Sequence, residues 1–276
     1  MNKKTSKKVS SRKAATESQA KSYMQESIPD LNVSDGTSGL KEAITILTNR
    51  AEPVEKRQEA LQMLQAASFG ITQFERVRED YTAALRDVAQ DPEMSLRQRV
   101  LGLLSLQNDP YAEKVLLDGL KDVKKALVPA SDALSYLGNN AHSGVQSIAR
   151  TIFDGSKDTE VRQQALRVMA GDPQSLKTIQ KTLADKTESV DVRQLCATAL
   201  HALDPKSLQT WARKAVMDEA EDQTVVATGL TALSHFGDAE KITSDPALKK
   251  RITEMRSKAT ATVKKAATEI AKRYAL

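Results

Sequence analysis

Apolar residues recur along the chain in a short helical pattern that is itself repeated. The pattern is clearest at 161–169, which reads V-R-Q-Q-A-L-R-V-M. Related segments lie at 56–64, 96–104, 129–137 (the weakest copy), 192–200 and 225–233. Aligned on their second positions, successive copies are 40, 33, 32, 31 and 33 residues apart. A period in the thirties predicts one pair of helices that is stacked many times.

The first helix of each predicted pair keeps a small or slender residue at the fifth position of the pattern. These residues are Ala60, Val100, Ala133, Ala165, Cys196 and Gly229. Small side chains let a neighbouring helix approach closely, and protein interiors are densely packed. We therefore expect the fifth positions to be buried between helices.

Three predicted turns contain an aspartate followed by a proline, at 109–110, 172–173 and 204–205. Aspartate caps a helix N-terminus well, and proline is tolerated at the first helical position, so each dipeptide predicts the start of a second helix. Six residues after the prolines stand Leu116, Ile179 and Trp211, which we expect in one buried column. Gly171 and Gly237 are expected to end first helices in the left-handed conformation.

Both ends of the chain differ from the repeats. Residues 1–39 predict a disordered basic arm, because few apolar residues are available there to bury. Its first cations are Lys3, Lys4, Lys7, Lys8, Arg12 and Lys13. At the other end, an apolar stripe from Leu248 to Tyr274 predicts one long helix of about 40 Å. We expect this basic helix, 249–276, to cap the stack.

The formal net charge of +5 is unevenly distributed. Residues 1–40 hold seven Lys and Arg against four Asp and Glu, and residues 249–276 hold nine against two. The repeats between them are therefore acidic overall. The basic ends are either solvated tails or electrostatic contacts for nucleic acid or an acidic partner.

The acidic opening, the V-R-x-x-A-L-x-x-M/L helix, the Asp-Pro turn and the L-x-x-I/L-x-x-x-L helix together resemble HEAT repeats. The period is similar to that of the short repeats first described in phycobilisome lyases. The resemblance covers about 40–248. It implies an all-α, right-handed superhelical solenoid of about six helical hairpins, with the second helices lining a concave surface.

The resemblance also implies a structural role for the arginine at the second position of the pattern. In such repeats it bonds an acidic residue or a carbonyl near the hairpin turn, and Asp158 is a candidate acceptor for Arg162. The arginines of this ladder are Arg57, Arg97, Arg162 and Arg193. Ala130 and Val226 stand at the same position and interrupt it.

The sequence contains no recognisable catalytic, cofactor-binding or metal-binding pattern. The three histidines are not spaced as metal ligands, and Cys196 occupies a predicted core position. Neither a phosphate-binding loop nor a dinucleotide fingerprint occurs. One cysteine, no long apolar run and no secretory signal favour a cytoplasmic protein without a membrane span.

These observations predict a non-enzymatic scaffold or adaptor that binds a protein partner along the concave face, without a cofactor. The residues expected to contact the partner are Arg150, Lys177, Lys181, Arg213 and Lys214. One alternative is a nucleic-acid-associated protein that uses the basic arm and the C-terminal helix. A second alternative is a lyase-type or assembly-factor subunit.

Overall fold

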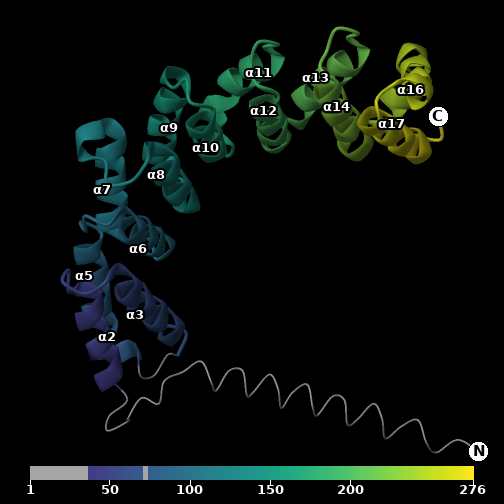
Figure 1. Cartoon of the computed structure of the whole chain (residues 1–276). Coiled ribbons are helices and arrows are strands. Elements are labelled where there is room, and N and C mark those ends of the chain that lie inside the picture. Colours follow the sequence, from purple (N-terminus) through teal and green to yellow (C-terminus); the bar gives the residue numbers. More distant parts are fainter. Residues whose placement is uncertain (1–36, 71–73) are drawn as a thin grey trace, which may run out of the picture. The chain divides into compact units, whose positions relative to one another are not determined.

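The computed structural model describes residues 37–70 and 74–276, in which every regular element is a helix (Figure 1). The predicted all-α architecture of stacked hairpins is therefore confirmed for this part of the chain. The predicted basic arm at 1–39 lies outside the described residues, except that Ser38 and Gly39 belong to the first helix. Among the described helices, none combines the length and the apolar character that a membrane span requires.

The chain divides into two compact units, an N-terminal unit of residues 1–96 and a C-terminal unit of residues 97–276. The described elements of the N-terminal unit are α2 (Ser38–Thr48), α3 (Val54–Ala67), a short 3-10 turn η1 (Glu75–Val77), α5 (Arg78–Val88) and the beginning of α6 (Met94–Leu106). Helix α2 packs against both α3 and α5. The core of the N-terminal unit includes Phe74 and Tyr81, whose ring centroids lie 5.2 Å apart in an edge-to-face arrangement.

The C-terminal unit continues with paired helices. They are α7 (Pro110–Lys121), α8 (Ala130–Leu137), α9 (Ser143–Gly155), α10 (Thr159–Met169), α11 (Leu176–Ala184), α12 (Val190–Leu203), α13 (Pro205–Met217), α14 (Gln223–Phe236), α15 (Ala239–Thr243), α16 (Pro246–Lys258) and α17 (Ala261–Tyr274). Within this unit, α8, α10, α12, α14 and α17 form one row, and α7, α9, α11, α13 and α16 form the other (Figure 1). The unit is thus two layers of helices with the core between them.

The small fifth positions of the pattern lie in this core. Ala165 and Cys196 are completely buried, and Ala133 is nearly so. At Gly229 the approach is closest, because a Cβ atom built there would lie 3.0 Å from the backbone oxygen of Ala212. The absence of a side chain allows α14 to pack directly on α13.

The aspartates before the prolines cap the second helices, as predicted. The Asp109 carboxylate accepts hydrogen bonds from the backbone N–H groups of Tyr111 and Ala112 at the start of α7. Three other aspartates accept backbone hydrogen bonds in the same way. Asp172 caps the 3-10 turn before α11, Asp204 caps α13, and Asp245 caps α16. The caps satisfy N–H groups that have no partner within the helix.

Two local predictions about this core and its turns are wrong. Leu116 and Ile179 are buried as expected, but Trp211 is only partly buried because Ala212 takes the core position on α13. The buried face of α13 therefore runs through Leu208, Ala212 and Ala215, and counting six residues from Pro205 does not identify it. Neither Gly171 nor Gly237 is left-handed, and the φ of Gly237 is −71°. Among the described non-glycine residues, Asn108 and Ala275 take the left-handed conformation.

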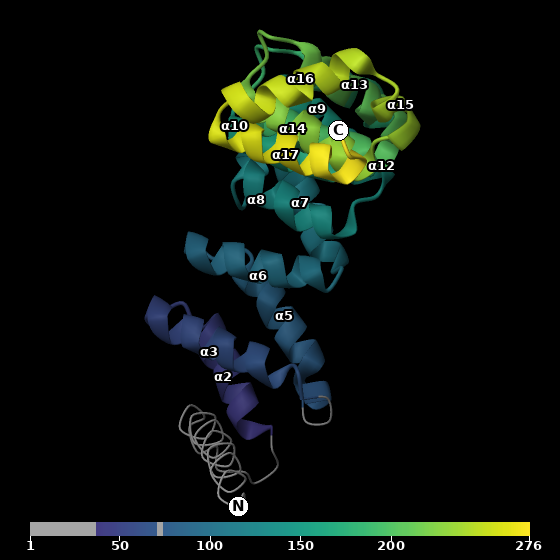
Figure 2. The same ribbon diagram turned by 90° about the vertical axis from the view of Figure 1, so that its right-hand side faces the viewer.

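The C-terminal segment is two helices and not the single long helix that the apolar stripe predicts. Helix α16 ends at Lys258, Ala259 has an extended ψ of 179°, and α17 begins at Ala261. Figure 2 shows α16 and α17 as two separate helices side by side, and they pack against each other. The stripe continues across the break because both helices bury their apolar faces, on α13 and α14 respectively.

Helix α17 is fastened to the preceding hairpin by the hydroxyl of Tyr274. Its oxygen lies 3.0 Å from the carbonyl oxygen of Leu233 and 3.1 Å from that of Gly237. We expect Tyr274→Phe to lower the free energy of unfolding by about 1 kcal/mol, because the ring stays and only the donated hydrogen bond is lost. Chemical denaturation measures this change. Faster amide exchange confined to α17 would support the assignment, whereas an unchanged midpoint and exchange pattern would contradict it.

Candidate functional site

The arginines at the second position of the pattern join helices in the interior of each unit. Arg193 donates from Nε to the carbonyl oxygen of Leu183 at 3.1 Å, at the end of α11. Its two Nη atoms donate to the two carboxylate oxygens of Glu221 at 2.8 and 2.7 Å. Both side chains are almost completely buried. This fork-to-fork pair connects α12 to the residue that precedes the cap of α14.

Arg57 makes the equivalent contacts in the N-terminal unit. Its Nε donates to the carbonyl oxygen of Leu47 at 2.9 Å, and its Nη2 donates to Asp91 Oδ2 at 2.5 Å. Asp91 precedes α6 just as Glu221 precedes α14, and only 1% of its side chain is exposed. Hydrogen bonds from Arg57 and from the N–H group of Glu93 hold the pKa of Asp91 below its ordinary value, although burial alone would raise it. The pair is therefore ionised and structural.

Arg162 and Arg97 follow the arrangement in part. Arg162 donates from Nη1 to the carbonyl oxygen of Phe153 at 2.7 Å and forms an ion pair with Glu188. Its expected acceptor Asp158 instead caps α10 by accepting from the N–H groups of Glu160 and Val161. Arg97 donates to the carbonyl oxygen of Leu127 at 2.8 Å. Leu127 follows Arg97 in the chain, whereas the carbonyl acceptors of the other three arginines precede them.

Two of the five residues expected to contact a partner are engaged within the protein. Arg150 on α9 forms an ion pair with Asp172, the cap that precedes α11, and also donates to Gln174 at 3.0 Å. Arg213 on α13 donates from Nε to Asp245, the cap of α16, at 2.6 Å. Each arginine therefore joins one helix of its row to the start of the next.

The other three expected contact residues are exposed. Lys177 and Lys181 lie on α11, and Lys214 lies on α13. Of the three, Lys214 borders a hollow of about 790 Å³ formed by α13 to α16, to which Arg213 also belongs. The structure thus places Arg213 and Lys214 together at the hollow, whereas Lys177 and Lys181 of α11 are not among its lining residues.

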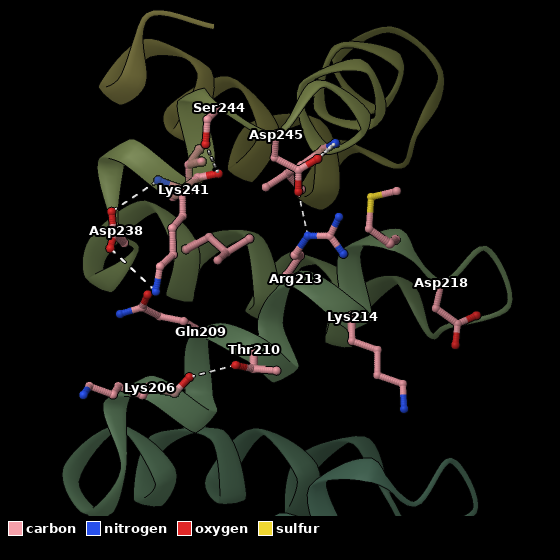
Figure 3. Close-up of a pocket in the computed structure, with 14 residues that line it drawn as sticks. Lys206, Gln209, Thr210, Arg213, Lys214, Asp218, Asp238, Lys241, Ser244 and Asp245 are labelled. Atoms are coloured by element: carbon pink, nitrogen blue, oxygen red, sulfur yellow. Dashed lines mark hydrogen bonds and ion pairs between the residues drawn. The ribbon is translucent and has the colours of Figure 1, made fainter.

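This α13–α16 hollow is a concave surface within the C-terminal unit. Figure 3 shows its charged and polar side chains, which come from α13, α15 and the N-terminus of α16. It is lined by Lys206, Gln209, Thr210, Arg213, Lys214, Met217, Asp218, Leu233, Asp238, Lys241, Ile242, Ser244, Asp245 and Leu248. Its walls are charged, and its floor consists of Leu233, Ile242 and Leu248, which are almost completely buried, while Met217 adds partly exposed apolar surface to the wall.

The hollow exists because the last hairpin departs from the repeat pattern. Asp238 caps α15, a single turn of helix, and only then does Asp245 begin α16. The inserted turn places Lys241 and Ile242 in the lining of the hollow, whereas the described hairpins α8–α9 and α10–α11 have only three-residue 3-10 turns at the corresponding place. The sequence signal for this turn is a second capping aspartate, Asp238, seven residues before Asp245, and the repeat pattern does not include it.

The three carboxylates of the hollow already have partners. Asp245 accepts from Arg213 and from the N–H group of Leu248, and these bonds hold its pKa below the ordinary value. Asp218 forms an ion pair with Lys186 at 2.6 Å, which likewise lowers its pKa. Asp238 caps α15. The negative charge of the hollow is thus largely compensated from within the protein.

The lysines of the hollow are less engaged. Within the described part of the chain, the ammonium groups of Lys206 and Lys214 form no ion pair. Lys241 approaches Asp238 only to 3.8 Å, and 81% of its side chain is exposed. Positive charge is therefore available to a ligand here. The chemistry offered is electrostatic and hydrogen-bonding recognition of an anion beside apolar surface.

The lining of the hollow contains neither histidine nor cysteine. Across residues 37–70 and 74–276 there is no group of three or more His, Cys, Asp and Glu side chains that could hold a metal ion. His142 caps α9 and lies 3.0 Å from Glu113, and His201 stacks on Phe236. These contacts give the two histidines structural roles.

Cys196 is expected to be chemically inert in the folded protein. Burial in the core raises the pKa of its thiol to about 12, so almost no thiolate is present near neutral pH. We expect a thiol reagent such as dithionitrobenzoate to label the native protein far more slowly than the protein in denaturant. Equal labelling rates in the two conditions would show that Cys196 is reactive and accessible.

Comparison with known proteins does not identify the chain. No model of a known protein family matches it, and no curated protein matches it. Among solved structures, human deoxyhypusine hydroxylase in complex with glycerol is similar over 87% of this chain and 97% of that chain. The sequence identity is 14% and the TM-score is 0.37. A similarity of that size assigns neither an activity nor a partner to this chain.

Proposed function

We propose that the protein is a non-enzymatic, cytoplasmic interaction scaffold of the HEAT-repeat type, which binds a protein partner in the α13–α16 hollow. The observation that carries the proposal is the combination, in this one hollow, of unpaired ammonium groups with an apolar floor. The buried arginine pairs support it, because they hold the hairpins in a fixed geometry on which a preformed surface can be built. The resemblance of the repeat pattern to HEAT repeats also supports it.

A photo-crosslinking amino acid at Thr210 tests the proposal, because Thr210 is exposed and lines the hollow. Thr198 on α12 is exposed but is not among the lining residues, and it provides the matched control position. A partner in extract of the native host should be crosslinked at 210 and not at 198. Purified partner should then bind more weakly to Thr210→Trp, whose bulky side chain obstructs the hollow, at an unchanged melting temperature. Undiminished binding to Thr210→Trp would place the partner elsewhere.

A second candidate function is association with nucleic acid through α16 and α17. Within the described residues, one cation of α16 and α17 forms an ion pair: Arg251 lies 3.5 Å from Glu219. The others form none and are mostly exposed: Lys249, Lys250, Arg256, Lys258, Lys264, Lys265, Lys272 and Arg273. A concentration of unpaired cations of this kind favours binding to phosphates.

Titration of a labelled duplex at several salt concentrations tests this second candidate. Phosphate binding predicts that the logarithm of the affinity falls linearly with the logarithm of the salt concentration. Lys264→Glu with Lys265→Glu should reduce both the affinity and that slope. Binding that is weak at every salt concentration, or equal in the variant, would exclude α17 as a nucleic-acid contact.

A further inference from the structure

We propose that the α13–α16 hollow binds an extended acidic segment in which two acidic side chains lie four residues apart with an apolar side chain midway between them. This inference rests on the proposed function, since it names the class of partner that the hollow takes. It is carried by three observations about the lining residues: their charge, the spacing of two lysines along α13, and the apolar floor.

The charge of the hollow complements an anion. Four cations and three carboxylates line it. Asp245 and Asp238 are held at helix N-termini, and Asp218 is paired with Lys186 outside the lining. The cations that remain for a ligand are Lys206, Lys214 and the weakly paired Lys241. A basic segment, including the chain's own lysine-rich residues 1–13, would be repelled by the same groups.

The spacing of the lysines selects an extended ligand. Lys206 and Lys214 are eight residues apart on α13, which corresponds to about 12 Å along the helix axis. In Figure 3 they lie on opposite sides of the hollow. Residues four apart in an extended chain are separated by about 13 Å and point to the same face. The backbone positions of the two lysines are thus separated along α13 by nearly this spacing, and their long, flexible side chains can turn toward two such carboxylates.

The floor accounts for the apolar residue in the middle. Leu233, Ile242 and Leu248 lie beneath the hollow, and Met217 on its wall is partly exposed. In an extended segment the residue midway between the two acidic residues points to the same face as they do. Its side chain would be aimed into the hollow, where it would itself leave water and cover the exposed part of Met217. The recognised pattern is thus acidic, any, apolar, any, acidic.

The probe is an end-blocked, fluorescein-labelled peptide with glutamate, serine, leucine, serine and glutamate in this order, titrated by anisotropy against the full chain. Three control peptides carry glutamine for both glutamates, serine for leucine, or the leucine moved by one position. We expect each control peptide to bind at least about tenfold more weakly, since each removes a charge contact or aims the leucine away from the floor.

Charge-reversal variants locate the binding. Lys206→Glu with Lys214→Glu should weaken binding of the probe about tenfold or more, because two attractive contacts become repulsive. Lys177→Glu with Lys181→Glu on α11 makes the same charge change on exposed lysines outside the hollow, and Lys264→Glu with Lys265→Glu does so on α17. Both control variants should retain binding. Equal loss in all three pairs would overturn the proposal by showing only general electrostatic attraction.

A peptide library selected on wild type and counter-selected on Thr210→Trp separates this inference from the proposed function. Enrichment of acidic peptides with the stated spacing supports both. Enrichment of neutral or basic peptides that depend on the hollow overturns the inference and leaves the scaffold function standing. If no enriched peptide loses binding to Thr210→Trp, the proposal that partners bind in the hollow is overturned. Displacement of the acidic probe by a duplex oligonucleotide, in a manner that depends on Lys206, would assign the hollow to nucleic acid instead.

Discussion

Glu221→Gln is expected to lower the free energy of unfolding by about 3 kcal/mol and the melting temperature by about 6–12 °C. The Glu221 carboxylate is 6% exposed and is the bidentate partner of Arg193, whose side chain is 3% exposed. The amide of glutamine keeps the size and one acceptor, but it leaves the guanidinium charge uncompensated in the core. An unpaired buried charge costs much more than a lost surface ion pair. Denaturant and thermal unfolding measure the change.

The stabilising effect of Glu221 should depend on pH in a defined direction. Hydrogen bonds from Arg193 hold the pKa of Glu221 below its ordinary value of 4.5 in the folded protein. A carboxyl group with a lowered folded-state pKa contributes stability that is fully present above the unfolded value and is lost as the pH falls through the folded value. The difference in stability between wild type and variant should therefore be constant near neutral pH and shrink below 4.5.

Two controls separate the buried charge from other effects at Glu221. Glu219→Gln removes the charge of a neighbouring carboxylate that is 86% exposed, and its effect should stay below about 1 kcal/mol. Arg193→Met with Glu221→Leu removes both charges and should be more stable than Glu221→Gln alone, because no charge is left unpaired. If the single and double variants were equally unstable, lost packing and not the unpaired guanidinium would be the cause.

Gly229→Leu is expected to lower the free energy of unfolding by about 3 kcal/mol, because it separates α13 from α14. The first atom of any side chain at this position would lie 3.0 Å from the backbone oxygen of Ala212 and 3.3 Å from Cγ2 of Val216. The backbone of α13 cannot rotate away as a flexible side chain could. Gly229→Ala should have a smaller effect, since one methyl group needs a shift of only a few tenths of an ångström.

Gly171→Leu is the matched control for this substitution. A Cβ atom at Gly171 meets no other atom within 4 Å, and the residue is exposed. We expect that variant to change stability by less than about 0.5 kcal/mol, which is the usual range for surface substitutions. Comparable destabilisation at both positions would mean that loss of glycine, and not close helix packing, limits the fold.

Local features of the fold were predictable because they depend on neighbours in the sequence. Small fifth positions such as Ala165 and Cys196 could be placed in the core, since the helical period fixes which residues share a face. The capping role of Asp109 followed from the proline after it. Each of these features is decided within about two turns of helix.

Features that depend on how the helices are placed relative to one another were not predictable in detail. The acidic partners of Arg57 and Arg193 lie 34 and 28 residues away, so that only the stacked hairpins reveal Asp91 and Glu221 as acceptors. The break at Ala259 gave no signal, because the residues around it are compatible with a continuous helix. The hollow is formed in part by the short helix α15, and the period of the repeats does not predict an additional helix there.

The same is true of the residues that we expected to contact a partner. All five lie on second helices, as the pattern predicted, but sequence alone did not separate the internally paired Arg150 from the available Lys214. That distinction depends on where Asp172 lies in the folded chain. Lys206, which lines the hollow, directly follows Pro205, and the repeat pattern does not distinguish it as a concave residue.

The arginine pairs also determine how far a local disturbance can travel. Each pair couples one hairpin only to its sequence neighbour, as in a chain of nearest-neighbour couplings. At Ala130 the equivalent side chain has no group that can donate, so this form of coupling is interrupted at α8. We therefore expect local unfolding that begins at α14 to be transmitted through the arginine pairs of α12 and α10, and to pass α8 only through helix packing and weaker hydrogen bonds. The degenerate repeat should thus limit the cooperativity of unfolding along the C-terminal unit.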